Sequence, residues 1–287
     1  MTGRIIDGTA VATDVRSRVS KVVTRLKSHG IDPCLATVLV GENPASAAYV
    51  KNKQKAANEI GITTRDHKIP STFKQNELLE LINLLNHDVE VHGILIQLPL
   101  PPHIDEFLVI NMINPKKDVD GLTPYNSGML LKGKGILKPC TPSGIMELLD
   151  YYKIDVTGMD TVIVNRSDLV GKPLSFLLLE RDATVTICHS LSKGLHNKLS
   201  TADLIITAVG NRDRFTLTAD MVKDGGVVID VGITRYMGKL SGDVEFQSVK
   251  EKASWITPVP GGVGPMTVSM LLKNTVSAAS MSEKVIC

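Results

Sequence analysis

Short apolar runs rich in β-branched residues recur along this chain, and most are followed by a longer stretch whose apolar residues have helical spacing. This alternation predicts βα units. Strands joined through helices run parallel, because the helix returns the chain to the starting edge of the sheet. The pattern therefore predicts an α/β fold built on parallel sheets. The expected strands are 35–40, 62–69, 93–98, 161–164, 184–188, 204–209 and 227–231, and the expected helices are 8–28, 46–61, 75–87, 143–152, 172–180 and 266–279.

The composition changes in the middle of the chain, where a Gly- and Lys-rich stretch leads into Pro139-Cys140-Thr141-Pro142. Such turn-forming stretches often mark domain boundaries. We therefore expect two domains with a cleft between them. An N-terminal α/β domain covers 1–138, and a Rossmann-like, doubly wound parallel sheet that binds a nucleotide covers 139–265. A C-terminal helix at 266–287 is expected to return to the N-terminal domain.

The charge balance excludes several classes of function. In 287 residues, 32 Lys and Arg nearly balance 30 Asp and Glu, so no global field favours nucleic acid or an anionic membrane. No segment approaches twenty uninterrupted apolar residues, and the start of the chain does not resemble a signal peptide. The four Cys lack CxxC spacing and the seven His lack an HExxH pair. We expect a cytoplasmic protein with reduced thiols and no metal.

Three polar positions in the N-terminal half are candidates for catalysis or binding. Tyr49 and Lys53 lie one helical turn apart, and a lysine that loses contact with water becomes a usable acid or base. Gln97 ends an otherwise apolar strand, at the carboxyl edge where α/β sheets bind ligands. Asp120 lies in the polar connection 114–122. The alternatives are a surface Tyr/Lys pair, a glutamine bonded to loop backbone, and a solvated loop carboxylate.

The turn 165–171 lies where a dinucleotide-binding fold places its phosphate loop, between a strand and a helix N-terminus that attracts anions. It lacks G-x-G-x-x-G, so an ordinary strand-to-helix connection remains an alternative. His189-Ser190 replaces the carboxylate that an NAD site carries after its second strand. Arg166, Ser190 and Lys193 could instead surround a 2′-phosphate, which favours NADP over NAD. The alternative for Arg166 is a solvated loop charge.

The stretch Pro258–Pro265 combines three prolines and three glycines. Proline fixes an irregular backbone, and glycine lets a flat ligand approach that backbone closely. We therefore expect a ligand-binding loop, with a tight domain connector as the alternative.

Together these motifs resemble the methylenetetrahydrofolate dehydrogenase/methenyltetrahydrofolate cyclohydrolase family, nearly from end to end. The resemblance is carried by Tyr49-Val50-Lys51-Asn52-Lys53, Gly93-Ile94-Leu95-Ile96-Gln97-Leu98-Pro99-Leu100-Pro101, Lys117-Asp118-Val119-Asp120-Gly121, Pro139-Cys140-Thr141-Pro142, Val227-Val228-Ile229-Asp230-Val231-Gly232-Ile233 and residues 258–267.

The resemblance implies a two-step reaction: NADP-dependent oxidation of 5,10-methylenetetrahydrofolate, then hydrolysis of the methenyl product to 10-formyltetrahydrofolate. It implies a folate-binding catalytic domain at 1–138, an NADP-binding domain at 139–265, and a homodimer. Lys53 would be catalytic, with Tyr49 and Gln97 beside it. Asp120 would hold the pterin, and these four residues would bind substrate with Pro258, Pro260, Gly261, Gly262 and Pro265. The implied cofactor-binding residues are Thr141, Asn165, Arg166, Ser167, Ser190 and Ile233.

Two departures from the family pattern keep an alternative open. The family usually has Gly where this chain has Asn165, which adds a side chain where backbone should approach the cofactor. Residues 209–215 also differ from the usual Gly-Lys-Pro loop. A cyclohydrolase with weak or absent dehydrogenase activity is therefore the first alternative. The others are a different two-domain NAD(P) dehydrogenase, a short-chain dehydrogenase built on Tyr49 and Lys53, and a non-catalytic NADP- or folate-binding regulator.

Overall fold

The computed structural model describes residues 2–236 and 238–286, apart from the side chains of residues 45 and 283–286. The chain divides into two compact units. The first unit comprises the chain up to Thr13 together with Thr141–Thr267, and the second comprises Asp14–Cys140 together with the chain from Val268 onward.

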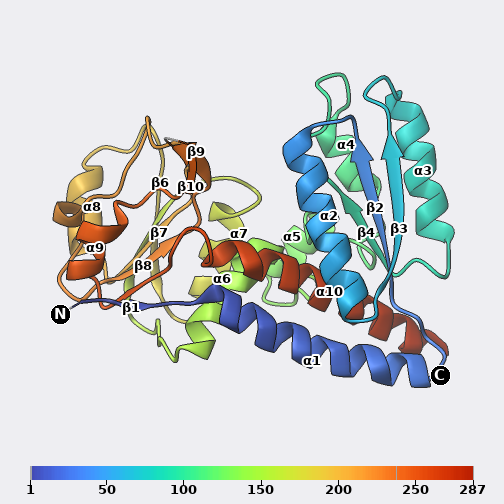
Figure 1. The fold of residues 1–287 in the computed structure, drawn as a ribbon, viewed down its shortest axis with the longest axis horizontal. Helices are drawn as coiled ribbons and strands as arrows, with labels where there is room; N and C mark the ends of the chain where they lie inside the picture. Colours follow the sequence, from blue (N-terminus) through green and yellow to red (C-terminus); the bar gives the residue numbers. More distant parts are fainter. Residues whose placement is uncertain (1, 237, 287) are drawn as a thin grey trace. The chain divides into compact units, whose positions relative to one another are not determined.

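The first unit contains a six-stranded sheet in the order β1-β11-β8-β7-β5-β6, in which every pair is parallel (Figure 1). The strand order reverses at β5, because β6 lies on one side of it and β7 and then β8 on the other. In such doubly wound sheets, ligands bind at the carboxyl edge beside this switch point. The strands are β1 (Arg4–Ile5), β5 (Asp160–Val164), β6 (Thr184–Cys188), β7 (Leu204–Thr207), β8 (Val227–Asp230) and β11 (Trp255–Ile256).

Helices pack on this sheet and bury its β-branched residues. Helix α7 (Gly171–Leu179) contacts β5 and β6, and α8 (Leu195–Thr201) contacts β5. The buried core on one face includes Val162, Ile205 and Val228 from three neighbouring strands. The remaining elements of the unit are α6 (Cys140–Tyr151), the 3-10 helix η1 (Ala219–Met221), the antiparallel hairpin β9 (Thr234–Tyr236) and β10 (Lys239–Ser241), and α9 (Phe246–Lys252).

The second unit contains a three-stranded parallel sheet in the order β3-β2-β4. Its central strand is buried along its whole length, as expected for a parallel strand covered on both faces. Helix α2 packs on β2 and β3. The elements are α1 (Gly8–Ser28), β2 (Cys34–Val40), α2 (Pro44–Glu59), β3 (Thr63–Ile69), α3 (Gln75–His87), β4 (Gly93–Ile96), α4 (Glu106–Met112), α5 (Pro124–Leu131) and α10 (Val263–Ile286), of which α1 and α10 begin before Asp14 and Val268.

The predicted two-domain α/β class with a doubly wound parallel sheet is confirmed. Every strand and helix expected from the sequence is present. The bounds differ by at most three residues, except that the last helix ends at Ile286 rather than at 279. The four short α-helices α4, α5, α8 and α9, the 3-10 helix η1, the β9–β10 hairpin and the two-residue strands β1 and β11 were not predicted, because segments this short carry too little periodicity. Among the described residues, no helix is long and apolar enough to cross a membrane.

Candidate active site

Lys53 and Gln97 are hydrogen-bonded in the second unit. The Lys53 Nζ donates to Gln97 Oε1 at 3.2 Å, and Gln97 Nε2 donates to the Leu98 carbonyl at 2.7 Å. The second bond fixes the orientation of the amide, so its oxygen faces the ammonium. Tyr49 lies one turn before Lys53 on α2, with 48% of its surface exposed. The phenol and the ammonium therefore share a helix face that solvent reaches at Tyr49.

The local sequence explains why these side chains are held in place. Asn43 Oδ1 accepts from the Ser46 N–H at 3.2 Å, and Pro44 opens α2 at a position where its missing N–H is tolerated. The backbone N–H of Gln97 donates to the Val38 carbonyl and extends the pairing of β4 with β2 by one residue. Gln97 thus sits at the carboxyl edge of the sheet, as predicted.

Asp120 is positioned by a loop that its neighbour Asp118 organises. The buried Asp118 carboxylate accepts from the backbone N–H groups of Gly121, Leu122 and Thr123 at 2.8 to 3.2 Å, and from Asn126 Nδ2 at 2.9 Å. It therefore acts within the loop rather than on a ligand. Gly121 has φ +71°, and a Cβ there would lie 2.6 Å from the Lys138 carbonyl carbon, so this turn requires glycine.

The electrostatic surroundings of Asp120 come from Lys53 and Cys140. Burial raises the pKa of the Asp120 carboxyl, while the Lys53 ammonium and a hydrogen bond from the Cys140 thiol act in the opposite direction. Burial, reinforced by the Asp120 charge, raises the pKa of Cys140 well above its usual value. Cys140 therefore stays a neutral thiol. The second unit brings an ammonium, a carboxylate and a fixed amide into one electrostatically coupled group.

Cys140 and Asn274 support this group, and neither was expected to be a site residue. Asn274 Nδ2, on α10, donates to the carbonyls of Val119 and Lys138 at 2.8 and 2.9 Å. The Cys140 Sγ also lies 3.4 Å from the Val119 carbonyl. The Pro-Cys-Thr-Pro motif was a signal for Cys140, whereas a single polar residue on an apolar helix gave only a weak signal for Asn274.

The candidate cofactor residues of the first unit follow the carboxyl ends of its strands. The turn containing Asn165, Arg166 and Ser167 follows β5, Ser190 follows β6, and Ile233 follows β8. Arg166 and Ser190 are exposed, and 41% of the Ile233 surface is exposed. The polar groups after β6 include no carboxylate before Asp203, so the donors at this edge suit a nucleotide that carries an additional phosphate.

Thr141 does not follow a strand of this sheet. It lies at the start of α6, where its hydroxyl is 2.9 Å from the hydroxyl of Thr267 on α10. The structure therefore joins Thr141 to the end of the Pro- and Gly-rich loop within the first unit.

The side chain of Asn165 does not extend away from its turn. Its Oδ1 accepts from the backbone N–H groups of Ser167 and Gly171 and from the Ser167 hydroxyl, and its Nδ2 donates to the Ala208 carbonyl. The carboxamide is therefore hydrogen-bonded to its own turn and to the residue that follows β7. Asn165 also has an ordinary backbone, since the described non-glycine residues with positive φ are Lys153 and Asp182.

The unusual loop 209–215 is also held firmly. The buried Asp243 carboxylate accepts from the backbone N–H groups of Val209 and Gly210 at 2.6 and 2.8 Å. Arg212 donates to Ser241 Oγ at 2.7 Å, and its guanidinium lies 5.0 Å from the ring centre of Tyr236. The residues that replace the family's usual sequence thus anchor the loop to the β9–β10 hairpin.

The Pro- and Gly-rich loop is fixed by two contacts that the sequence did not reveal. The buried Thr257 Oγ1 accepts from the Asp230 N–H at 2.7 Å. The Gly261 carbonyl accepts from the Thr9 N–H at 3.1 Å, and a Cβ at Gly8 would lie 1.7 Å from the Gly262 oxygen. The candidate residues Pro258, Pro260, Gly261, Gly262 and Pro265 therefore belong to a loop fixed within the first unit.

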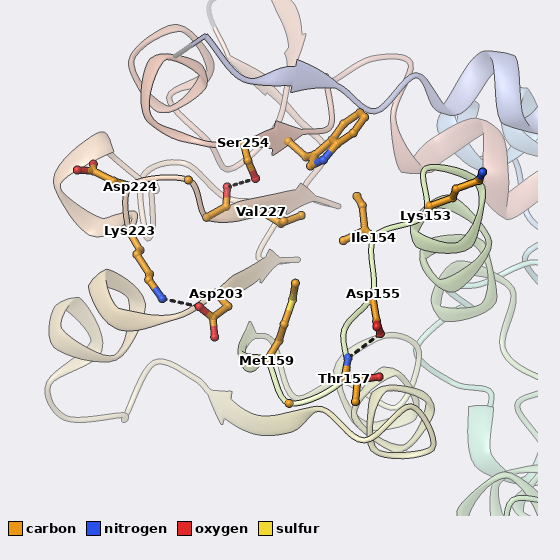
Figure 2. Close-up of a pocket in the computed structure, with 14 residues that line it drawn as sticks. Lys153, Ile154, Asp155, Thr157, Met159, Asp203, Lys223, Asp224, Val227 and Ser254 are labelled. Atoms are coloured by element: carbon orange, nitrogen blue, oxygen red, sulfur yellow. Dashed lines mark hydrogen bonds and ion pairs between the residues drawn. The ribbon is translucent and has the colours of Figure 1, made fainter.

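A separate hollow of about 580 Å³ lies at the opposite edge of the same sheet (Figure 2). Met159, Asp203 and Ser254 line it, and each precedes a strand, so the hollow is at the amino edge. Lys223 pairs with Asp203, and Asp155 accepts from the Thr157 N–H, so these charges already have partners. The edge that binds ligands in doubly wound sheets is the other one.

Comparisons with known proteins give one result. Residues 6–120 match the catalytic domain of the tetrahydrofolate dehydrogenase/cyclohydrolase family, and residues 139–283 match its NAD(P)-binding domain. The bifunctional protein FolD of Nitrosopumilus maritimus is 56% identical over 285 residues, which is 99% of each chain.

Two solved structures are similar along the whole chain. The bifunctional enzyme FolD of Campylobacter jejuni superposes with a TM-score of 0.94 at 49% identity, covering 97% of this chain and 99% of that one. The Trypanosoma brucei dehydrogenase-cyclohydrolase, solved with NADP and an inhibitor, superposes with a TM-score of 0.93 at 36% identity and covers 99% of each chain.

Proposed function

Because this chain belongs to the tetrahydrofolate dehydrogenase/cyclohydrolase family, and is a bifunctional enzyme of one-carbon folate interconversion, we propose that Lys53 moves the protons of its hydrolytic step. The enzyme oxidises 5,10-methylenetetrahydrofolate to the 5,10-methenyl form and hydrolyses that product to 10-formyltetrahydrofolate. The observation that supports Lys53 is its hydrogen bond to the fixed Gln97 amide, beside Asp120.

The hydrolysis needs a group that takes up one proton and donates another. Water adds to the methenyl carbon and loses a proton, and the ring nitrogen N5 gains a proton as its bond to that carbon breaks. Lys53 serves both transfers: as the neutral amine it takes up the water proton, and as the ammonium it donates a proton to N5, while Gln97 Oε1 holds its Nζ in one place. Tyr49, one turn away, orients the water or relays a proton. The product is the neutral formyl amide, and the second proton of the water leaves to solvent.

Asp120 is proposed to hold the pterin. The pterin presents a guanidine-like edge with two parallel N–H donors, which a carboxylate can accept together. The neutral Cys140 thiol hydrogen-bonds this carboxylate without adding a competing charge. Tyr49, Lys53 and Gln97 complete the proposed substrate contacts in the catalytic domain, 1–138. The proposed contacts from the loop are Pro258, Pro260, Gly261, Gly262 and Pro265.

NADP is the proposed cofactor, bound by the domain at 139–265 and accepting the hydride from the methylene carbon. The missing carboxylate after β6 and the exposed Arg166, Ser190 and Lys193 support NADP rather than NAD. Arg166 makes no hydrogen bond or ion pair in the described part of the chain, so its guanidinium is available for a phosphate. Thr141, Asn165, Ser167 and Ile233 complete the proposed cofactor site. No metal is proposed to take part.

The proposed oligomer is a cytoplasmic homodimer. The outer side of β6 is an edge of the six-stranded sheet, and an unpaired edge is a ready surface for a second copy. Ile187 on this strand and Leu191 after it are 36% and 76% exposed. Cys34, Cys140 and Cys188 are buried free thiols, which suits a reducing compartment.

Lys53→Met tests the central proposal. Without the amine, the variant should still reduce NADP in the presence of methylenetetrahydrofolate, and the methenyl intermediate should accumulate because its hydrolysis falls by about 100-fold or more. Nicotinamide reduction and methenyl absorbance are followed separately in one assay. Lys51→Met, which removes an exposed lysine from the same helix, is the matched control and should behave as the wild type. Unchanged methenyl hydrolysis in Lys53→Met would refute the role of Lys53.

A further inference from the structure

The Asn165 side chain makes four hydrogen bonds, all within the first unit. Its Oδ1 accepts from the Ser167 N–H at 2.7 Å, the Ser167 hydroxyl at 2.7 Å and the Gly171 N–H at 3.0 Å. Its Nδ2 donates to the Ala208 carbonyl at 2.7 Å. The Ser167 hydroxyl also accepts from the Val170 N–H at 3.1 Å. The carboxamide is thus the centre of a network that closes the turn 165–171.

This network spans the switch point of the sheet. Asn165 follows β5 and Ala208 follows β7, and these neighbouring strands are the pair at which the strand order reverses. The bond from Nδ2 to the Ala208 carbonyl therefore links the two carboxyl ends that flank the ligand-binding crevice of a doubly wound fold. A glycine here, as the family usually has, makes none of these side-chain bonds.

The packing of the turn leaves little freedom around this network. A Cβ added to Gly171 would lie 2.2 Å from the Asn165 carbonyl oxygen, so the start of α7 is pressed against the end of β5. The Gly171 N–H belongs to the first turn of α7, where a free amide would face an anion. Here the Gly171 N–H already donates to Asn165 Oδ1. The Ser167 hydroxyl likewise donates its single proton to Asn165 Oδ1.

We propose that Asn165 is a positioning residue for the cofactor: its carboxamide fixes the turn 165–171 and the end of β7 before NADP binds, and leaves the phosphate contacts to Arg166. This inference rests on the proposed NADP site. A turn that is already ordered does not lose conformational entropy when the cofactor binds, so its affinity is higher than that of a loose turn.

Asn165→Gly distinguishes a positioning residue from an obstruction. Isothermal titration calorimetry with NADP alone should give a dissociation constant raised about tenfold, because four hydrogen bonds that order the turn are lost. Hydrogen–deuterium exchange of the apo chain should become faster at residues 165–171. In the dehydrogenase assay KM for NADP should rise with kcat nearly unchanged. The far-ultraviolet circular dichroism spectrum of the apo variant should match that of the wild type, which shows that the variant is folded.

Two further variants complete the test. Asn165→Asp keeps the oxygen acceptor but cannot donate to the Ala208 carbonyl, so NADP should bind several-fold more weakly. Asn197→Asp, a similar change at an exposed position of α8, should leave NADP binding unchanged. Equal or tighter NADP binding in Asn165→Gly, or unchanged binding in Asn165→Asp, would overturn the inference alone. Wild-type protein that fails to bind NADP would overturn the proposed cofactor as well.

Discussion

At the scale of single residues, two neighbouring aspartates have different tasks. Asp118 is buried and directs its carboxylate to four N–H donors of its own loop. Asp120, two residues later, is partly buried, accepts from the Cys140 thiol and faces the Lys53 charge. The Asp118 carboxylate stabilises the loop, and the Asp120 carboxylate remains available for a ligand.

Asp120→Asn should weaken folate binding in both activities. A carboxamide cannot accept two hydrogen bonds from the guanidine-like edge of a pterin, and a lost charge-assisted bond weakens binding by about 10- to 100-fold. KM for methylenetetrahydrofolate in the dehydrogenase assay should rise by this factor, with no change in KM for NADP. Asp66→Asn, an exposed aspartate on β3, is the matched control. An unchanged folate KM would contradict the assignment of Asp120.

The sequence could predict these residues only in part. Both aspartates lie in Asp118-Val119-Asp120-Gly121, and only the resemblance to the family selected the second. The four hydrogen bonds of the Asn165 side chain were not predicted, because a residue type alone does not show which backbone groups its side chain can reach. Asn274 could not be predicted, because its two acceptors, Val119 and Lys138, lie more than a hundred residues away in the chain.

At the scale of elements, two buried aspartates join the loops that follow β7, β8 and β10. Asp230 accepts from the N–H groups of Gly232, Asp243 and Val244, each at 3.0 Å, and from the Thr207 hydroxyl at 3.3 Å. The Asp243 carboxylate in turn accepts from the backbone N–H groups of Val209 and Gly210. The strands themselves were predictable from their β-branched runs. This junction was not, because it depends on side chains brought together only after the sheet has formed.

Asp230 should give the enzyme a measurable dependence of stability on pH. Burial raises its pKa from 3.8 to about 6, with the nearby Asp243 charge adding to the shift and the backbone N–H groups opposing it. The folded state therefore binds this proton more tightly than the unfolded state, and the free energy of unfolding should fall as pH rises from 3.8 to about 6. The contribution is roughly 3 kcal/mol at most.

Thermal unfolding between pH 4 and pH 7 tests this expectation by difference. Asp230→Asn has no carboxyl to titrate at this position. The melting temperature of the wild type minus that of the variant should therefore decrease as the pH rises. Asp243 and Arg212 are the other charged groups at this junction, and both remain in the variant. A difference in melting temperature that is constant over this range would contradict the raised pKa of Asp230.

At the scale of the whole molecule, the edge strand β6 determines the expected assembly. It pairs with β5 alone among the described strands, and a long unprotected edge invites pairing with another chain. Its position at one end of the strand order follows from the doubly wound topology. The sequence predicted that topology from its βα repeats, whereas the length and exposure of the edge required the structure.

Ile187→Lys should convert a dimer into a monomer. A charge placed on the exposed edge strand opposes close pairing with a second copy. Light scattering after gel filtration should give the mass of two 31.0 kDa chains for the wild type and of one chain for the variant. Leu84→Lys changes a residue that is 68% exposed in the other unit, and it should leave the mass unchanged. A wild-type monomer, or a dimeric Ile187→Lys, would contradict the proposed interface.

The pairing of β1 with β11 also affects how the chain is made in the cell. Arg4 and Ile5 pair with Trp255 and Ile256, so β1 leaves the ribosome about 250 residues before its partner strand. At about 5 to 20 residues per second, this strand remains unpaired for on the order of tens of seconds while the residues between β1 and β11 are translated. The first unit can therefore close only after β11 has been translated, whereas the sheet of the second unit has all three of its strands by residue 96. During translation, the second unit can build its sheet while the first still waits for its last strand.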